Sequence, residues 1–387
     1  MRAATGLVSL RLGVPKRYNL RAYRIPVDVG QYLPLTYGGR TLQNRFVTSL
    51  RVHKVSLLPS LFALLLSSSC QSTKPALPEK EAPSVLGIEV IPRTPERLAR
   101  GKYLVEGLVQ CFLCHSELDY AHRGMQPLPG KKGGGFVFPA DESEIPLPYR
   151  VVAPNISPDP DYGAGKWKDS DFVRALRQGI GHDGRALFPL MPYNYFRHLS
   201  DNDLASIIVY ERSIAPVHIQ RPRTELPQDV MQTFQPLPPL EHVPEPDQSN
   251  PVKYGEYLVT VGHCDLCHTP VDEKGNALAG LNFAGGSPMV GPWGTTVASL
   301  NLTPDPSGIS YFDEQMFIDT IRNGRVKARL LSNAMPWGYF RNLTDADLKA
   351  IFAYLRTLKP VRHRVDNTEP PTYCKLCRNK HGLGDLN

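Results

Sequence analysis

Two short segments of the sequence share the pattern C-x-x-C-H: residues 111–115 read Cys-Phe-Leu-Cys-His, and residues 264–268 read Cys-Asp-Leu-Cys-His. In c-type haem attachment, two thiols form thioether bonds to the porphyrin and the adjacent histidine binds the iron. Two cysteines three positions apart on a helical turn match the two vinyl groups of the porphyrin. The sequence therefore predicts two covalently bound haems c. The residues expected to hold them are Cys111, Cys114, His115, Cys264, Cys267 and His268.

A C-x-x-C pair can also bind zinc or form a disulfide. Zinc would need two more ligands at C-x-x-C or H-x-x-H spacing close to each motif, and the sequence has none there. Each motif instead opens a similar module of more than 100 residues, and this duplication favours haem.

Met191 and Met335 are the candidates for the distal iron ligands. Each follows its C-x-x-C-H motif at a similar distance, precedes a proline and has a counterpart in the other module. A methionine thioether is a soft, neutral donor that favours ferrous iron and raises the reduction potential. The alternatives are that both methionines fill core space, or that His182 or His198 binds iron in the first module.

The elements that must position these residues recur in the same order in both modules. A helix precedes each motif, with Gly101 and Tyr103 in the first module and Gly255 and Tyr257 in the second. Small residues on a helix let a second helix approach closely. The closing helices of the two modules carry equivalent tyrosines, which we expect to pack against the glycine-bearing helices. These are Tyr210 and Tyr354.

Turns and caps also repeat. A long loop rich in glycine and proline follows the first motif and is expected to wrap around a haem edge. Asn155 and Asn301 each begin an Asn-x-Ser/Thr-Pro-Asp segment, whose repetition suggests turn residues that bind backbone rather than glycosylation sites. Residues 200–203 and 344–347 resemble capping boxes with Asp in place of Glu.

The formal charge of +7 is concentrated at one end of the chain. Residues 1–70 hold ten Lys and Arg and one Asp, a net of +9. The remainder holds 34 basic and 36 acidic residues, a net of −2. The part expected to fold is thus nearly neutral, so we expect no nucleic-acid partner.

A basic residue, an apolar run and small residues ending at Cys70 resemble a bacterial lipoprotein signal over residues 52–70. We expect lipidation of Cys70 and a location on the periplasmic side of a bacterial membrane, with a proline-rich tether over residues 71–95. Residues 1–51 are expected to be a non-native extension upstream of the true start. For residues 52–70, the alternative to a signal is a buried helix in which Cys70 has no special role.

These features together resemble the dihaem c-type cytochromes, in particular the cytochrome c subunits of membrane-bound alcohol and gluconate dehydrogenases. The resemblance implies an all-α fold of two tandem class I cytochrome c-like domains. The expected domains span residues 96–214 and 251–361, and residues 215–250, with eight prolines, form a semi-rigid linker between them. Those family subunits often have three such domains, whereas this chain has two.

The expected function is transfer of single electrons, without catalysis by the chain itself. The expected donor is a dehydrogenase or a quinol-oxidising complex, and the acceptor an oxidase or another cytochrome. The alternative is a dihaem peroxidase, which needs one haem with a distal position that is open or can be opened. Two matched methionines argue against it.

The tail, residues 362–387, contains a third C-x-x-C pair, Cys374 and Cys377, but Arg378 replaces the histidine. We expect no haem there. In an oxidising compartment the pair is expected to form a disulfide, because four cysteines go to haem and Cys70 to lipid. The alternative is that Cys374 and Cys377, together with His381, form part of a metal site.

Overall fold

A computed structural model describes residues 91–138, 150–240, 242–272, 275–290 and 296–383. The expected extension, the signal with Cys70 and most of the tether lie outside these residues. The described residues all belong to one compact unit. Along them, no helix combines the length and the apolar character needed to cross a bilayer.

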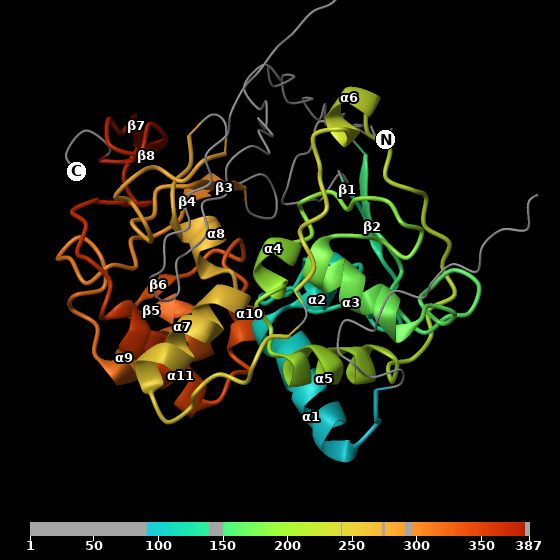
Figure 1. Ribbon diagram of the computed structural model, residues 1–387. Helices are drawn as coiled ribbons and strands as arrows, with labels where there is room; N and C mark the ends of the chain where they lie inside the picture. The colour runs from blue at the N-terminus through green and yellow to red at the C-terminus, as the bar shows by residue number, and fades with distance from the viewer. Residues whose placement is uncertain (1–90, 139–149, 241, 273–274, 291–295, 384–387) are drawn as a thin grey trace, which may run out of the picture. The chain divides into compact units, whose positions relative to one another are not determined.

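Most of the regular structure in the first repeat, residues 96–214, is helical, and one short helix lies in the segment that follows it (Figure 1). The helices are α1 (Pro95–Tyr103), the π-helix η1 (Leu104–Leu108), α2 (Cys111–Cys114), α3 (Asp169–Gln178), α4 (Tyr193–Phe196), α5 (Asp201–Glu211) and α6 (Gln228–Met231). Strands β1 (Phe136–Phe138) and β2 (Val151–Ala153) form an antiparallel pair in which Val137 faces Val152.

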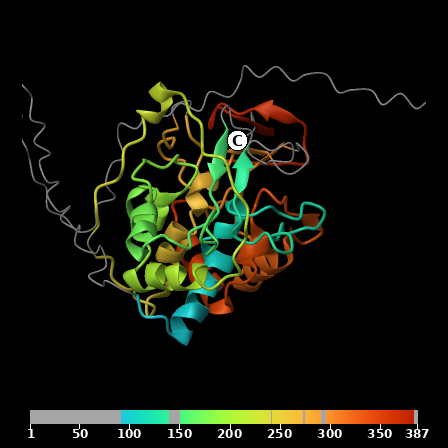
Figure 2. The same ribbon diagram turned by 90° about the vertical axis from the view of Figure 1, so that its right-hand side faces the viewer.

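The second repeat, residues 251–361, has the same order of helices. They are α7 (Pro251–Val261), α8 (Cys264–His268), α9 (Glu314–Asn323), α10 (Trp337–Phe340) and α11 (Asp345–Leu355). Short antiparallel pairs join β3 (Pro288–Val290) to β4 (Thr296–Ala298) and β5 (Arg325–Val326) to β6 (Arg329–Leu330). The tail adds the hairpin β7 (Pro371–Tyr373) and β8 (Lys380–Gly382), red in Figure 2.

The opening and closing helices of each repeat touch at a glycine. A Cβ on Gly101 of α1 would lie 1.9 Å from the carbonyl oxygen of Ser206 in α5, and one on Gly255 of α7 would lie 1.9 Å from that of Ala350 in α11. Both positions therefore require glycine. The β-carbons of the two tyrosines on the closing helices flank these glycines, which confirms the predicted packing; the tyrosines are Tyr210 and Tyr354.

The two repeats differ by one residue in the opening helix. Ten positions separate Gly101 from Cys111, whereas nine separate Gly255 from Cys264. The first repeat absorbs the extra residue in η1, where the Val109 amide bonds to the Leu104 carbonyl five positions back. A single π-turn is the usual way for a helix to accommodate one inserted residue.

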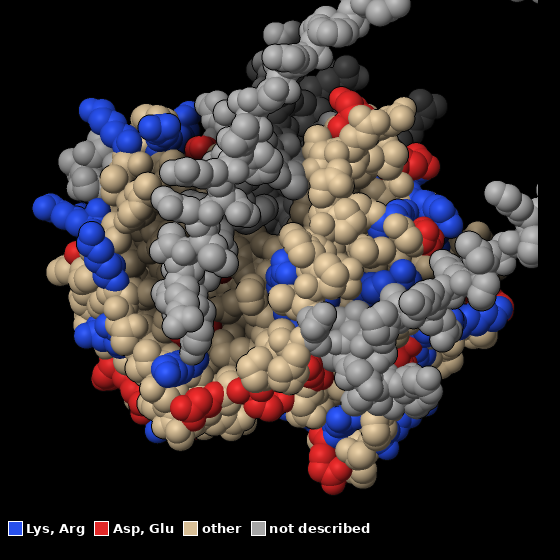
Figure 3. Space-filling view, viewed as in Figure 1, with Lys and Arg blue, Asp and Glu red and all other residues tan. Residues whose placement is uncertain are grey.

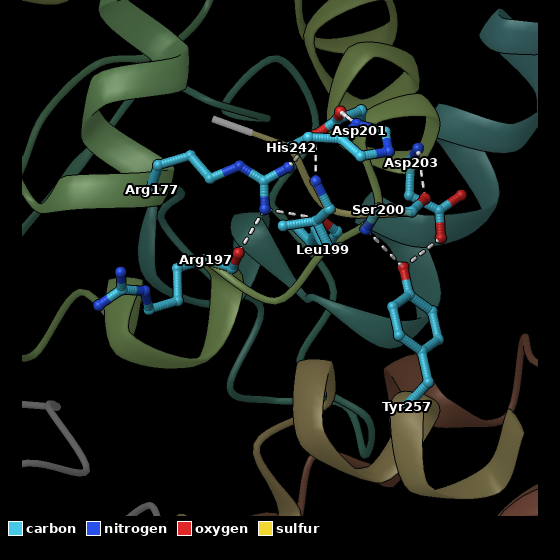
Figure 4. Close-up of polar contacts among 9 residues, drawn as sticks. Arg177, Arg197, Leu199, Ser200, Asp201, Asp203, His242 and Tyr257 are labelled. Atoms are coloured by element: carbon cyan, nitrogen blue, oxygen red, sulfur yellow. Dashed lines mark hydrogen bonds and ion pairs between the residues drawn. The ribbon is translucent and has the colours of Figure 1, made fainter. Parts of the chain in front are cut away.

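The caps of the closing helices are completed by tyrosines from the opposite repeat. Ser200 Oγ accepts from the Asp203 amide at 3.1 Å, as the capping-box prediction requires. The aspartate does not return to the Ser200 amide. Instead, the Tyr257 hydroxyl accepts from the Ser200 amide at 3.1 Å and donates to Asp203 Oδ2 at 2.6 Å, as Figure 4 shows.

The same arrangement occurs in the other direction. The Tyr103 hydroxyl accepts from the Thr344 amide at 3.0 Å and donates to Asp347 Oδ2 at 2.6 Å. Asp is one methylene shorter than the Glu of an ordinary capping box, and the tyrosine hydroxyl fills the gap. The repeats also share their main apolar core. It includes Leu104, Phe196, Leu258 and Leu343.

The proline-rich segment 215–250 packs against the first repeat. The Asp201 carboxylate, at the start of α5, accepts from His242 Nδ1 at 2.5 Å and from the Val243 amide at 3.2 Å, and the Asp201 amide donates to the Val243 carbonyl at 2.9 Å. Arg177, which is fully buried, donates to the same carboxylate at 2.7 Å and to the Leu199 carbonyl at 2.6 Å (Figure 4). The segment therefore contributes hydrogen bonds to the repeat as well as connecting the two halves.

Candidate functional site

Both C-x-x-C-H motifs lie on the single helical turn that the sequence predicts, α2 in the first repeat and α8 in the second. A residue in the left-handed region precedes each turn: Gln110 with φ 54° and His263 with φ 45°. A non-glycine residue with this backbone is uncommon and costs free energy. The chain thus makes a sharp bend immediately before each pair of cysteines.

The two motif histidines are oriented in the same way. His115 Nδ1 lies 2.8 Å from the Pro154 carbonyl oxygen, and His268 Nδ1 lies 2.7 Å from that of Leu300. A carbonyl oxygen only accepts, so each Nδ1 carries the proton and each Nε2 presents a lone pair. Burial lowers the pKa of both imidazoles and so favours this neutral form. Metal-binding histidines are typically oriented by such a second hydrogen bond.

The loop after each motif returns to its histidine. Gly135 donates its amide to the His115 carbonyl at 2.9 Å, and Gly285 donates to the His268 carbonyl at 2.7 Å. In the first repeat the Ser116 hydroxyl also accepts from the Gly133 amide at 3.0 Å. The glycine-rich loop therefore folds around the attachment segment, in the place where the sequence predicts a loop around a haem.

The two asparagine turns support these loops. Asn155 Oδ1 accepts from the Ser157 amide at 3.0 Å while Nδ2 donates to the Val217 carbonyl at 2.7 Å. Asn301 does the same with the Thr303 amide and the Val361 carbonyl. Both asparagines are buried, which confirms the prediction that they bind backbone.

A cavity of about 810 Å³ opens beside α8. Four of the predicted haem-binding residues line it: Cys264, Cys267, His268 and Met335. Most of its other lining residues are apolar, and they include Leu302, Phe317, Ile321, Phe340 and Leu348. Its volume is within the usual range of cofactor sites. The cavity thus offers two thiols, an imidazole and a thioether in apolar surroundings, a donor set that fits a haem c.

The methionine-bearing bends of the two repeats match. Met191 and Met335 each lie between a turn and a short helix, with the amide two positions later bonded to the methionine carbonyl. Met191 packs against the main core. The competing donors His182 and His198 are both exposed, and the His182 ring stacks on Trp167.

Each attachment segment also contacts the opposite repeat, which the sequence does not predict. The Tyr195 hydroxyl donates to Asp265 of the second motif at 3.3 Å. Its equivalent, Tyr339, is buried near the first motif, where burial and the Cys114 thiol raise its pKa. Leu108 and Arg123 of the first repeat line the cavity of the second. The two candidate sites therefore lie on either side of one interface.

Glu211, the last residue of α5, is a buried carboxyl that no sequence motif indicates. It is 3% exposed, and burial raises its pKa to about 8. The nearby Cys111 thiol partly offsets this rise in pKa. The sequence gives one hint: the equivalent helix α11 ends at an apolar residue, Leu355, in the position that Glu211 occupies in α5.

Charged side chains are scattered over the described surface. On the face seen in Figure 3, basic and acidic residues are interspersed, with uncharged surface between them. Many are paired, such as Lys349 with Glu314 at 3.1 Å and Arg322 with Asp345 at 2.6 Å.

Comparison with known proteins gives several relatives. The chain is 28% identical over 305 residues to the cytochrome c subunit of a quinone alcohol dehydrogenase from Gluconacetobacter polyoxogenes, covering 72% of this chain and 60% of that one. It is 29% identical over 280 residues to a gluconate 2-dehydrogenase cytochrome c subunit from Pantoea cypripedii, covering 67% and 59%.

A dihaem c-type cytochrome of Cereibacter sphaeroides is 29% identical over 227 residues, covering 54% of this chain and 72% of that one. No family model matches the chain. The chain spans about 60% of the length of the alcohol dehydrogenase subunits. The resemblance indicated by the motifs is thus confirmed: the chain is a homologue of cytochrome c subunits of alcohol, gluconate and fructose dehydrogenases and of a dihaem cytochrome c.

Proposed function

We propose that the chain is a dihaem electron-transfer protein that carries single electrons between redox partners. Its haems c would be attached through the paired cysteines of α2 and α8. The proximal ligands would be His115 and His268, and the distal ligands Met191 and Met335. The cavity that collects Cys264, Cys267, His268 and Met335 carries this proposal, because it supplies every expected ligand type in one apolar space.

A haem c held by these residues would supply one-electron chemistry, because its iron is stable in both the ferrous and the ferric state. The chain's own part is to hold and insulate that group. The Pro154 and Leu300 carbonyls fix the histidine tautomers, and the apolar lining keeps water away. A soft methionine ligand would raise the potential and fill the last coordination position.

The shared interface supports electron exchange between the two sites inside one chain. Tyr195 reaches Asp265 of the second motif, and Leu108 lines the second cavity. Both attachment segments therefore adjoin the contact between the repeats. An electron that enters at one haem would cross this contact to the other without a diffusional step.

The relatives suggest the class of partner. Their names describe cytochrome c subunits of dehydrogenases that act on alcohols, gluconate and fructose. We propose a dehydrogenase or a quinol-oxidising complex as donor and an oxidase or another cytochrome as acceptor, on the periplasmic side of a bacterial membrane. The lipid anchor at Cys70 stays a prediction. The relatives do not favour the peroxidase alternative.

Haem counting tests the proposal. Full-length protein matured in a bacterial host should retain two haems per chain after denaturation. The variant Cys111→Ala with Cys114→Ala should retain one haem. Only a haem joined to cysteine by thioether bonds stays on the denatured chain, and this variant has no cysteines in the first motif. The matched variant Cys264→Ala with Cys267→Ala should also retain one. Two haems in either double variant would rule out the corresponding motif as an attachment site.

A further inference from the structure

The tail brings together four side chains that the haem sites do not use. Cys374 and Cys377 lie in the turn between β7 and β8, His381 lies on β8, and His363 comes from the segment before the hairpin. Each is at most 2% exposed, and their candidate ligand atoms all lie within 4.8 Å of one another. Within the described part of the chain no cysteine sulfurs are joined, so the expected disulfide is not formed in this structure.

We propose that His363, Cys374, Cys377 and His381 bind a structural zinc ion. Tetrahedral zinc with sulfur at about 2.3 Å and nitrogen at about 2.0 Å places two nitrogens about 3.3 Å apart and a nitrogen and a sulfur about 3.5 Å apart. The two histidine Nε2 atoms are 3.0 Å apart, and His363 Nε2 is 3.5 Å from Cys374 Sγ. These separations are close to those required by one small ion.

The ring orientations also favour a cation. His363 Nδ1 lies 2.9 Å from the Ala284 carbonyl oxygen, and His381 Nδ1 lies 3.1 Å from that of Gly382. Both Nδ1 atoms therefore carry protons, and in the neutral rings both Nε2 atoms present lone pairs. Two lone pairs facing each other at 3.0 Å repel unless a proton or a metal lies between them.

The first repeat provides an internal comparison at the loop. Gly135 and Gly285 are equivalent because each donates to the carbonyl of its motif histidine. The next residue is Phe136 in the first repeat but Gly286 in the second. A Cβ at position 286 would lie 2.5 Å from His363 Cε1. Because Gly286 has no side chain, the His363 ring can occupy this space.

A second difference involves the histidine itself. Asn155 donates to the Ile219 carbonyl, and Asn301 donates in the same way to the His363 carbonyl. The first repeat thus has an isoleucine where the second has a proposed zinc ligand. Two changes at equivalent positions, together with the tail hairpin, build the cluster only on the second repeat.

The charge and proton balance also fit zinc. Zn²⁺ displaces one proton from each thiol, so two thiolates, two neutral imidazoles and the ion make a buried site of zero net charge. A bound ion would fasten the hairpin to the loop next to Gly285, whose amide supports His268. The proposed role is therefore to hold the tail against the loop behind the second haem site. This zinc site does not depend on the electron-transfer function proposed above.

Elemental analysis of the full-length, haem-loaded protein tests this inference, with chain concentration taken from amino-acid analysis. We expect one zinc per chain, and zinc-edge X-ray absorption should show sulfur at about 2.3 Å and nitrogen at about 2.0 Å. The variant Cys374→Ser with Cys377→Ser should lose at least nine-tenths of the zinc and retain its haems. His363→Gln should weaken zinc retention against a chelator by about 10-fold or more.

His122→Gln is the matched control, because His122 is an exposed histidine of the first repeat. It should keep the full zinc content. Limited proteolysis gives a second measurement: zinc removal should speed cleavage in residues 364–383 without changing cleavage in the first repeat. Wild-type protein without zinc, or a tail peptide 2 Da lighter because of a Cys374–Cys377 disulfide, would overturn the proposal.

Discussion

Tyr103 and Asp347, 244 residues apart in the chain, are joined by a hydrogen bond of 2.6 Å in which the hydroxyl donates to the carboxylate. Tyr257 and Asp203 form the reciprocal bond, also at 2.6 Å. Each hydroxyl in addition accepts from the amide that begins the opposite closing helix. One side chain thus serves both as a helix cap and as a contact between the repeats.

Replacing either tyrosine by phenylalanine should destabilise the protein. Tyr103→Phe and Tyr257→Phe each remove a hydrogen bond to a charged group, worth about 1.5–3 kcal/mol of unfolding free energy. Tyr311→Phe is the control, since Tyr311 is 57% exposed, and it should change that free energy by less than about 0.5 kcal/mol. Denaturant unfolding of the haem-loaded protein measures all three. Equal midpoints for the three variants would contradict the proposed role of these bonds.

Gly255→Ala should destabilise the second repeat, because the new Cβ would lie 1.9 Å from the Ala350 carbonyl oxygen. Forced separation of packed elements costs about 1–3 kcal/mol or more. Gly107→Ala is the matched control in a helix, where the nearest atom is the Leu343 Cδ2 at 3.3 Å. It should change the unfolding free energy by less than about 1 kcal/mol. Similar thermal midpoints for both variants would disprove the close-packing argument.

The distal ligand can be tested within one cavity, since Met335 and Met289 both line it. Met335→Ala should make the second haem high-spin, lower its potential and allow the ferrous form to bind carbon monoxide. Met289→Ala should leave a low-spin haem with the weak far-red methionine-to-iron band. The reverse result would assign the ligand to Met289. Met191→Ala should affect the first haem in the same way as Met335→Ala affects the second.

Glu211 should make stability fall as pH rises. Burial raises the folded-state pKa of its carboxyl to about 8 from its ordinary value of 4.5. Between these values the folded protein holds a proton that the unfolded chain releases, so unfolding free energy declines by up to about 1.4 kcal/mol per pH unit. Glu211→Gln should flatten this decline and be more stable than wild type at pH 8.

The control is Glu314→Gln, since Glu314 is an exposed surface carboxylate. Its unfolding free energy should follow the wild-type pH profile. Denaturant midpoints between pH 5 and pH 8 provide the comparison. An unchanged slope in Glu211→Gln would show that the carboxyl ionises normally in the folded protein.

Local features of the fold were predictable because local chemistry determines them. Gly101 and Gly255 indicated a close helix contact, and Asn155 and Asn301 indicated backbone-binding turns. In each case a residue type matches a need that arises within one repeat. Duplication strengthened these predictions, since the same residue recurs at the equivalent position.

Contacts between distant segments were not predictable. The sequence places Tyr257 on the helix before the second motif, but it does not indicate that the Tyr257 hydroxyl completes a cap in the other repeat. Asp203 stands where an ordinary capping box has the longer Glu, which indicates that the cap needs another group. Which group supplies it depends on how the two repeats pack together. His363 was missed for the same reason: it precedes Cys374 by 11 positions, and only the fold of the tail brings the two together.

The exchanged tyrosines give the interface the self-complementarity of a two-fold symmetric dimer. Tyr103 contacts Asp347 while its counterpart Tyr257 contacts Asp203, so each surface presents the same donor and acceptor to the other. Because segment 215–250 connects the two repeats covalently, they associate within one chain instead of as two separate molecules. The connection raises the effective concentration of each repeat at the surface of the other. Pairing of the two sites would therefore be independent of how much protein the cell contains.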